Sequence, residues 1–317
     1  MRKLIALVLA GVAATALDAS QVALPSDSSR PVRFAVIGDA GTGRRPQHEV
    51  GERLAAARSS FPFEFVVMTG DNMYGRQSPQ DFVDKFERPY AALLEAGVRF
   101  YAALGNHDRP SNRFYEGFNM RGERFYTFVM GPVRFVMLDT NAMDRSQLTW
   151  LERVLGDARE PWKIAVFHHP LYSNARRHGP SVDLRVLLEP VFTRHAVNVV
   201  FAGHEHVYER LKPQKGITHF IEGASGQLRK GDMRPSDSTA AAYDDDRTFM
   251  LVEVRNDQMT FRTLSRTGLV VDSGVIARRG EANRPGLGTT PPAATSEAPR
   301  PRSRGASIPS HARPLAE

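Results

Sequence analysis

Five short apolar segments constrain this sequence more than any other feature, because each one ends in a glycine or tight turn that carries Asp, Asn or His. These polar clusters occupy residues 38–41, 70–74, 105–108, 168–170 and 203–206. In open α/β sheets the ligand crevice lies at the carboxyl ends of the strands, so we expect the five clusters to meet at one site. A single Gly-Asp pair after a strand is usually a turn, and a His-x-His pair is often incidental. Five such clusters in order are not explained by turns.

The pattern between the ends of the chain alternates strands with helices. It predicts strands at 33–37, 65–69, 100–104, 162–167 and 197–202, helices at 47–58, 82–96, 146–155 and 182–193, and a hairpin at 125–138 around Gly131-Pro132. From residue 218 onward the pattern is mostly β, with strands at 249–254, 259–264 and 269–275. Strand–helix alternation followed by strands predicts an α/β domain of sheets covered by helices.

The two ends of the chain differ from its centre, and we divide the sequence into four parts. Residues 1–19 are a predicted signal peptide and the start of a linker, with basic residues at 2 and 3, an apolar run at 4–14 and an Ala-Thr-Ala cleavage pattern at 14–16. The linker continues through 20–31, the domain covers 32–277, and residues 278–317 form a Pro- and Arg-rich tail that we expect to be disordered. The apolar run is shorter than the ~20 residues that span a membrane. The alternative for this run is a buried helix; the signal interpretation implies a secreted or periplasmic protein.

The charge and cysteine content exclude several functions. The net charge is +7, of which the tail contributes +4 and residues 1–19 contribute +1, so the domain itself is nearly neutral. Nucleic acid is therefore not expected as the main partner. The tail either remains solvated or touches an anionic envelope surface. There are no cysteines, which excludes disulfides, a thiolate zinc site and a cysteine nucleophile.

The chemistry of the five clusters is that of a metal site built from oxygen and imidazole. Such donors suit zinc, manganese and iron. Two ions about 3.5–4 Å apart bind a phosphoryl group and activate water, and one aspartate can bridge them. The candidate donors are Asp39, Asp71, Asn106, His168, His204 and His206.

In these clusters the sequence resembles the calcineurin-like metallophosphoesterases. That family has the ordered pattern Asp-x-Gly, Gly-Asp-x, Gly-Asn-His-Asp/Glu, a His after a strand, and Gly-His-x-His, and all five blocks occur here between Asp39 and His206. Tyr74 stands three residues after Asp71, where purple acid phosphatases have a tyrosine that binds a ferric ion, and the chain looks similar to the small tartrate-resistant type. The alternative for Tyr74 is an aromatic side chain that packs on the loop without binding metal. The resemblance implies two packed mixed β-sheets flanked by helices, a four-layer sandwich.

The resemblance also implies a ligand for each metal position. The first ion, expected to be Fe(III), would be held by Asp39, Asp71, Tyr74 and His206. The second, Fe(II), Zn or Mn, would be held by Asp71, Asn106, His168 and His204, with Asp71 bridging the two.

By the same resemblance, a hydroxide on or between the metals attacks phosphorus in a phosphomonoester, with an acid optimum. His107 is expected to protonate the leaving group or to hold the phosphoryl oxygen, and Asp108 is expected to orient the His107 imidazole. His178 is expected to contact substrate, with His169 as the rival because one residue is inserted before His178.

Two other functions remain open at this point. The first is a phosphodiesterase or nucleotidase on the same metals. The second is an envelope-binding protein whose site is vestigial and whose tail carries the function. In either enzymatic case the partner is a phosphorylated small molecule.

The mammalian-type enzymes carry disulfide-linked cysteines and a cleavable regulatory loop. This chain has no cysteines and a short segment between Asp139 and Trp150, so that regulation does not carry over.

Overall fold

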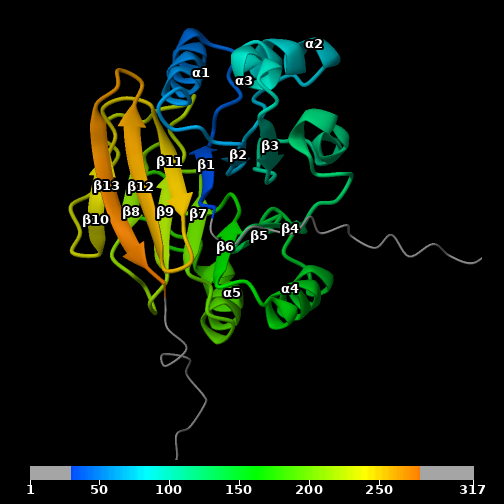
Figure 1. Cartoon of the computed structure of the whole chain (residues 1–317), viewed down its shortest axis with the longest axis vertical. Coiled ribbons are helices and arrows are strands. Elements are labelled where there is room, and N and C mark those ends of the chain that lie inside the picture. Colours follow the sequence, from blue (N-terminus) through cyan, green and yellow to red (C-terminus); the bar gives the residue numbers. More distant parts are fainter. Residues whose placement is uncertain (1–29, 279–317) are drawn as a thin grey trace, which may run out of the picture. The chain divides into compact units, whose positions relative to one another are not determined.

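The strands of this protein form two mixed sheets, as the computed structural model shows for residues 30–278 (Figure 1). One sheet has the order β13-β12-β11-β1-β2-β3 and the other β10-β8-β9-β7-β6-β5-β4. The strands of the first sheet are β1 (Val32–Ile37), β2 (Phe65–Met68), β3 (Arg99–Ala102), β11 (Thr248–Val254), β12 (Gln258–Ser265) and β13 (Val270–Ala277). Those of the second are β4 (Tyr126–Met130), β5 (Val133–Met137), β6 (Trp162–Val166), β7 (Val199–Ala202), β8 (Tyr208–Leu211), β9 (Thr218–Glu222) and β10 (Thr239–Tyr243).

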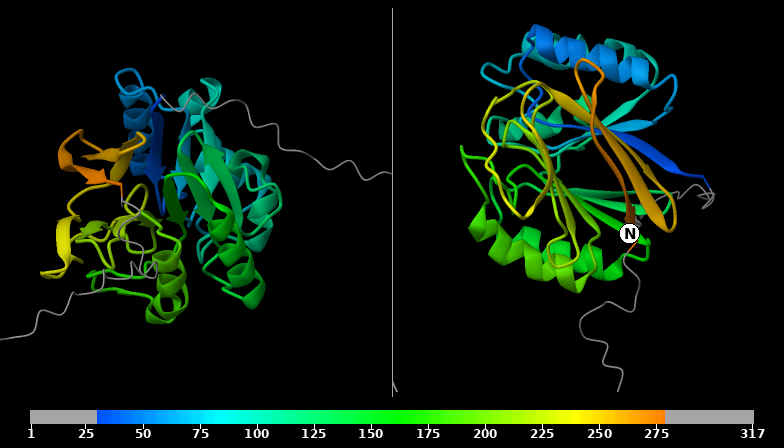
Figure 2. Two further views of the ribbon diagram at one scale, coloured as in Figure 1. Left: turned by 60° about the horizontal axis from the view of Figure 1, so that its bottom comes forward. Right: turned by 90° about the vertical axis from the view of Figure 1, so that its left-hand side faces the viewer.

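Helices cover the outer face of each sheet. They are α1 (Arg45–Ala57), α2 (Pro79–Phe82), α3 (Ala91–Glu95), α4 (Arg145–Asp157) and α5 (Val182–Arg194), with short π and 3₁₀ segments η1 (Val83–Glu87), η2 (Pro110–Phe114) and η3 (Glu116–Phe118). Figure 2 shows the blue and cyan helices over the first sheet and the green helices over the second. None of the helices in residues 30–278 has the length and apolar character needed to cross a membrane.

The alternation of side chains along the strands explains this arrangement. On β1, Phe34 and Val36 face the core between the sheets, whereas Ala35 and Ile37 face the helices. Successive side chains of a strand point to opposite faces, so a strand that is buried on both faces is apolar throughout. The core between the sheets joins Phe34 and Phe65 to Phe135 and Phe201 of the second sheet. The predicted fold, two packed mixed sheets flanked by helices, is confirmed.

Some elements differ from the prediction. The helical segments expected around 82–96 begin slightly earlier, at Pro79, and are α2, η1 and α3; Pro89 lies between η1 and α3, and a proline in a helix interior removes a hydrogen bond. The strands β8 and β10 were not predicted, because one carries Glu and Arg and the other is rich in alanine. The predicted signal peptide at 1–19 and most of the linker and tail lie outside the described residues.

The parallel strands of the two sheets determine where the five clusters lie. The strands β1, β2 and β3 run parallel in one sheet, and β5, β6, β7 and β9 run parallel in the other. Parallel neighbours have their carboxyl ends at the same edge of a sheet. The loops that follow β1, β2, β3, β6 and β7 therefore bring the clusters to one end of the sandwich.

Candidate metal centre

The turns after the strands aim short side chains inward. Asp39, Asp71 and His204 have φ angles of 51°, 52° and 71°, in the left-handed region that side chains rarely adopt. Each costs about 1–2 kcal/mol, although aspartate tolerates this conformation better than most residues. Backbone strain of this kind gathers at functional sites. In this protein it falls on three of the seven predicted ligands.

The first group of predicted ligands surrounds one oxygen of Asp39. The Tyr74 hydroxyl lies 3.0 Å from Asp39 Oδ1 and 3.2 Å from His206 Nε2. The His206 Nε2 atom lies 3.3 Å from the same Asp39 oxygen. The Tyr74 hydroxyl thus points toward the predicted ligands Asp39 and His206.

The second group surrounds Nε2 of His168. This nitrogen lies 3.0 Å from Asn106 Oδ1 and 3.2 Å from His204 Nδ1. Asp71 Oδ1 is 3.4 Å from it. Asp71 also lies with Asp39 and His168 in a group whose ligand atoms are within 4.8 Å of one another. Asp71 therefore lies within reach of ligand atoms of both groups.

The ligand atoms of this site are better suited to binding metal ions than to forming hydrogen bonds with one another. His168 Nδ1 lies 3.1 Å from the Thr69 carbonyl and so carries the proton, which leaves a lone pair on Nε2. That lone pair faces oxygens of Asn106 and Asp71, which are also acceptors. A cation at the centre of these converging acceptors would satisfy them together.

Electrostatics supports the same conclusion. Burial, together with the neighbouring Asp71 carboxylate, raises the pKa of Asp39 well above its ordinary value, and burial raises the pKa of Asp71. Burial and the neighbouring histidines lower the pKa of His204 to about 2. A bound cation reverses this destabilisation, because it favours charged carboxylates and neutral imidazoles. The metal-free site is therefore poised to bind cations.

His107 and Asp108 occupy different surroundings from those expected of a coupled pair. The His107 side chain is half exposed, its ring centroid lies 4.7 Å from that of Tyr74, and its Nε2 lies 4.0 Å from Asp71 Oδ2. The hydrogen bonds of the buried Asp108 carboxylate within residues 30–278 go elsewhere. Its partners are the backbone N–H groups of Asn72, Met73 and Gly105 and the amide groups of Asn72 and Asn112. The Asp108 carboxylate thus ties the second and third clusters together, and its hydrogen bonds in the described part of the chain do not include the His107 ring.

His178 and His169 both lie beside the second group. The ring centroid of His204 is 4.2 Å from that of His178 and 4.6 Å from that of His169. The Nδ1 of His169 is 2.9 Å from the Thr140 hydroxyl. The structure places both histidines at the site.

Glu205 is a residue of this site that the sequence analysis missed. Its buried carboxylate accepts hydrogen bonds from the backbone N–H groups of His178 and Gly179. It thus anchors the loop that carries His178 to the Gly-His-Glu-His turn. Its place between two predicted ligands was the signal that was available in the sequence.

Comparison with known proteins agrees with this geometry. A model of the calcineurin-like phosphoesterase family matches residues 32–208, more than half of the chain. The chain belongs to this family. It is therefore a metal-dependent phosphoesterase, and its homologues include purple acid phosphatases.

Two curated members of the family show how far the similarity extends. Human tartrate-resistant acid phosphatase type 5 is 26% identical over 310 residues, covering 81% of this chain and 95% of that protein. Purple acid phosphatase 17 of Arabidopsis thaliana is 25% identical over 248 residues, covering 67% of this chain and 73% of that protein.

Two solved structures share the fold of this phosphoesterase. The purple acid phosphatase PPD1 of yellow lupin seeds has a TM-score of 0.66 at 18% identity, covering 84% of this chain and 58% of that one. GAP50, described as the anchor in the inner membrane complex of Plasmodium, has a TM-score of 0.69 at 18% identity, covering 80% and 90% of the two chains. At this identity the likeness concerns the fold alone.

Behind the metal site the phosphoesterase buries a second acidic group, Glu222 at the end of β9. One oxygen of its carboxyl accepts hydrogen bonds from Thr248 and Ser225, and the other is buried and has no hydrogen-bond partner among the residues that the structure describes. The Ser225 hydroxyl in turn accepts the N–H of Gly38, next to Asp39. Burial raises the pKa of Glu222 to about 8, so this carboxyl is neutral at neutral pH.

The neutral state of Glu222 predicts a pH dependence of stability. The folded protein keeps this proton between about pH 4.5 and 8, whereas the unfolded chain loses it above its ordinary pKa of 4.5. Because the folded state binds the extra proton, stability falls as pH rises through this window. Compared with Glu222→Gln, wild type should lose up to about 3 kcal/mol more unfolding free energy between pH 5 and 8. Urea unfolding of both metal-free proteins at the two pH values measures this, and parallel losses would contradict it.

Proposed function

We propose that this phosphoesterase is an exported acid phosphatase that hydrolyses phosphomonoesters of small molecules at a dinuclear centre. The observation that carries the proposal is the position of the Tyr74 hydroxyl, within 3.2 Å of ligand atoms of both Asp39 and His206. A tyrosinate and two carboxylates suit a trivalent ion, which supports Fe(III) at the first position and Fe(II), Zn or Mn at the second.

The seven predicted ligands would hold the two ions in two sets that share Asp71. Asp39, Tyr74 and His206 would complete the first set, and Asn106, His168 and His204 the second. When bound, such ions lower the pKa of water for attack on phosphorus and offset the negative charge of the phosphoryl oxygens. A trivalent ion does so at lower pH than zinc, which supports an acid optimum.

The protein's own side chains would handle the proton and the substrate. His107 is exposed at the edge of the site, and its backbone N–H is fixed by a 2.8 Å hydrogen bond to Asp71 Oδ1. Its imidazole would donate a proton from Nε2 to the departing alkoxide. His178, on the loop that Glu205 anchors, would contact the phosphoryl oxygens.

Export rests on the sequence pattern at residues 1–19, which favours a secreted or periplasmic enzyme. We keep contact of the tail with an anionic envelope surface as an accessory proposal. A purely envelope-binding role with a vestigial site is not favoured, because all seven predicted ligands are present and point toward one another.

A visible absorption spectrum tests the first metal position. Purified protein with bound iron is expected to show a broad tyrosinate-to-iron band, and Tyr74→Phe should remove the band. Because Asp39, Asp71 and His206 remain in this variant, we expect it to retain much of its iron. A colourless wild-type protein that holds two zinc or manganese ions would refute the Fe(III) assignment.

The same sample tests the reaction. We expect faster turnover of 4-nitrophenyl phosphate than of bis(4-nitrophenyl) phosphate, at an optimum below pH 7. The opposite preference would establish the phosphodiesterase alternative on the same centre, and no turnover of either ester would refute the proposed function.

A further inference from the structure

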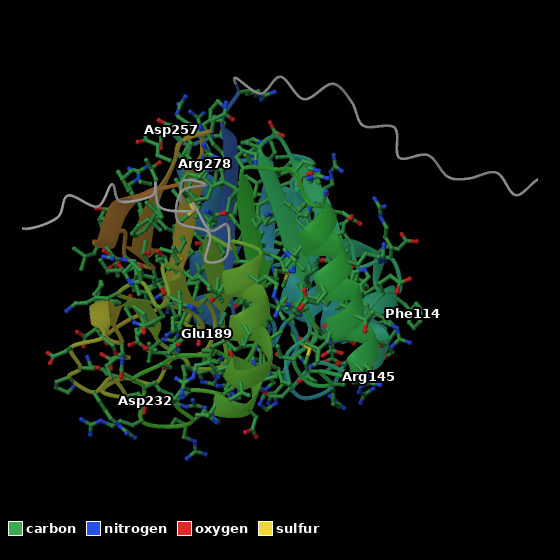
Figure 3. The ribbon with its side chains drawn as sticks, turned by 90° about the horizontal axis from the view of Figure 1, so that it is seen from below. Phe114, Arg145, Glu189, Asp232, Asp257 and Arg278 are labelled. Carbon is green, nitrogen blue, oxygen red and sulfur yellow. The ribbon has the colours of Figure 1, made fainter. Side chains whose placement is uncertain are left out.

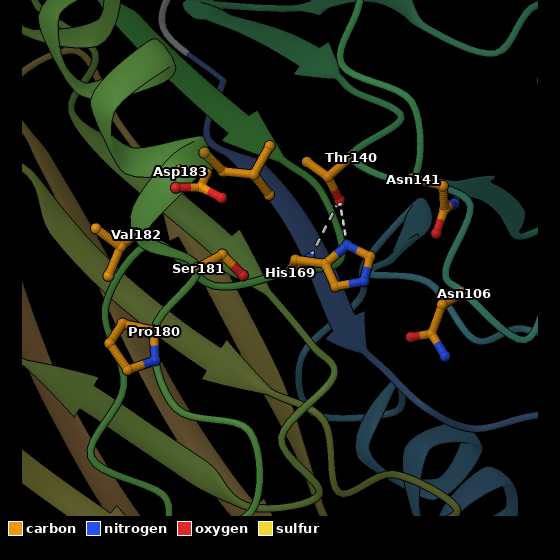
Figure 4. Close-up of a pocket in the computed structure, with 9 residues that line it drawn as sticks. Asn106, Thr140, Asn141, His169, Pro180, Ser181, Val182 and Asp183 are labelled. Atoms are coloured by element: carbon orange, nitrogen blue, oxygen red, sulfur yellow. Dashed lines mark hydrogen bonds between the residues drawn. The ribbon is translucent and has the colours of Figure 1, made fainter.

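A pocket of about 610 Å³ opens beside the second group of ligands (Figure 4). In Figure 4, His169 lies between Asn106 on one side and Ser181 and Asp183 on the other. Pockets of 300–1,000 Å³ accommodate typical small-molecule ligands. Since Asn106 is a predicted ligand, a phosphoryl group at the metal centre would lie at the inner end of this pocket. The ester's alcohol would then extend into it.

One wall of the pocket is apolar although it faces solvent. Pro180, Val182 and Leu184, in and before the first turn of α5, form this wall. Val182 is 48% exposed, and Val186, one turn further along α5, is 67% exposed. Exposed apolar side chains that adjoin a pocket are typical of a surface that contacts a ligand. This wall suits a hydrocarbon body, either aromatic or aliphatic.

The charges of the pocket disfavour anions. Its lining contains no lysine or arginine. The only carboxylate in the lining is Asp183, which is exposed and forms no ion pair within residues 30–278. An anionic leaving group in this pocket would be repelled by Asp183 and would find no cation there.

We propose that this pocket receives the leaving group, and that Asp183 selects esters of uncharged alcohols with a hydrocarbon body over anionic leaving groups such as nucleoside diphosphates. This inference rests on the proposed function. Asp183 also lies in the first turn of α5, where an acidic side chain stabilises the helix, so the experiment must separate selectivity from stability.

The experiment compares kcat/KM for 1-naphthyl phosphate with kcat/KM for ATP in the metal-loaded full-length protein. Asp183→Lys should lower the ratio of the two constants about tenfold or more, because it replaces repulsion of the anion by attraction. Asp183→Asn should lower it about threefold. Val182→Asn should raise KM for 1-naphthyl phosphate about threefold while KM for glycerol 2-phosphate stays the same.

The matched control is Asp257→Lys, which changes the net charge equally. Asp257 lies in the turn between β11 and β12. The end of β11, Val254, pairs with Val32 at the start of β1, so this turn lies at the end of the sheet opposite the predicted ligands. Figure 3 shows Asp257 beside Arg278 and far from Glu189 of α5. This variant should leave the ratio unchanged. The inference would be overturned if the ratio in Asp183→Lys stayed within twofold of wild type, or if it changed as much as the ratio in Asp257→Lys. A lower melting temperature of Asp183→Lys would not rescue it, because that reports stability and not selectivity. Wild-type protein without activity on any monoester would refute the proposed function as well.

Discussion

Replacing Asp71 with asparagine is expected to remove at least one of the two metal ions and to reduce phosphatase turnover by about a thousandfold or more. Asp71 lies 3.4 Å from His168 Nε2 and within the same cluster as Asp39, so its carboxylate serves both groups of ligands. An amide of the same shape carries no charge with which to hold two cations. The metal ions supply several kcal/mol of transition-state stabilisation, and each 1.36 kcal/mol corresponds to a tenfold change in rate.

The same substitution should have the opposite effect on the stability of the metal-free protein. Asp39 and Asp71 are both buried, and the charge of one raises the pKa of the other. Removing one carboxylate relieves this repulsion, so metal-free Asp71→Asn should melt at a higher temperature than metal-free wild type.

The matched control for this experiment is Asp139→Asn. Asp139 is also buried near the site, but its side chain pairs with Arg124 and Asn141, neither of which is a predicted ligand. This variant should lose stability and keep both metal ions. Metal analysis and kcat on the same samples distinguish the two residues. Full metal occupancy in Asp71→Asn would exclude Asp71 as the bridging ligand.

The sequence was sufficient for most of the strands and for the expectation that the five clusters meet, because both depend on local signals. An apolar run such as 33–37 followed by Gly-Asp predicts both a strand and the turn that carries the ligand. Parallel pairing then places the turns at one edge, which requires no knowledge of side-chain packing. The strands that were missed, β8 and β10, carry no clear strand pattern of their own. Their extended structure depends on pairing with neighbouring strands in the sheet.

The remaining parts of the site depend on contacts between residues that are distant in the sequence. The Thr69 carbonyl that fixes His168 lies 99 positions before it, and Glu222 acts on the Asp39 loop through Ser225. Asp108 adjoins His107 in the sequence, but its carboxylate bonds to the loop of Asn72 and Met73. Adjacency in a motif therefore did not reveal which groups the Asp108 carboxylate bonds to.

The second large effect is expected at Gly70, in the turn before Asp71. Gly70 has a φ angle of +107°, and a Cβ at this position would lie 2.6 Å from His168 Nδ1 and 2.9 Å from the Gly105 nitrogen. That His168 nitrogen bonds to the Thr69 carbonyl, so the added methyl group would push the imidazole away from its anchor. Overpacking typically costs 1–3 kcal/mol and a strained backbone conformation a further 1–3, so Gly70→Ala should destabilise the metal-free protein by about 3–5 kcal/mol. It should also weaken binding of the second ion, because His168 is one of its predicted ligands.

Gly75→Ala separates the two causes of this effect. Gly75 also has a positive φ, +67°, but a Cβ there would have no heavy atom within 4 Å. Gly75→Ala should therefore lower the free energy of unfolding only by the conformational penalty of about 1–2 kcal/mol, and it should bind metal like wild type. Urea unfolding of the metal-free variants and titration with zinc measure the two quantities separately. If both variants lost the same stability and bound zinc equally well, the close packing of Gly70 against His168 would not be what holds the second group of ligands in place.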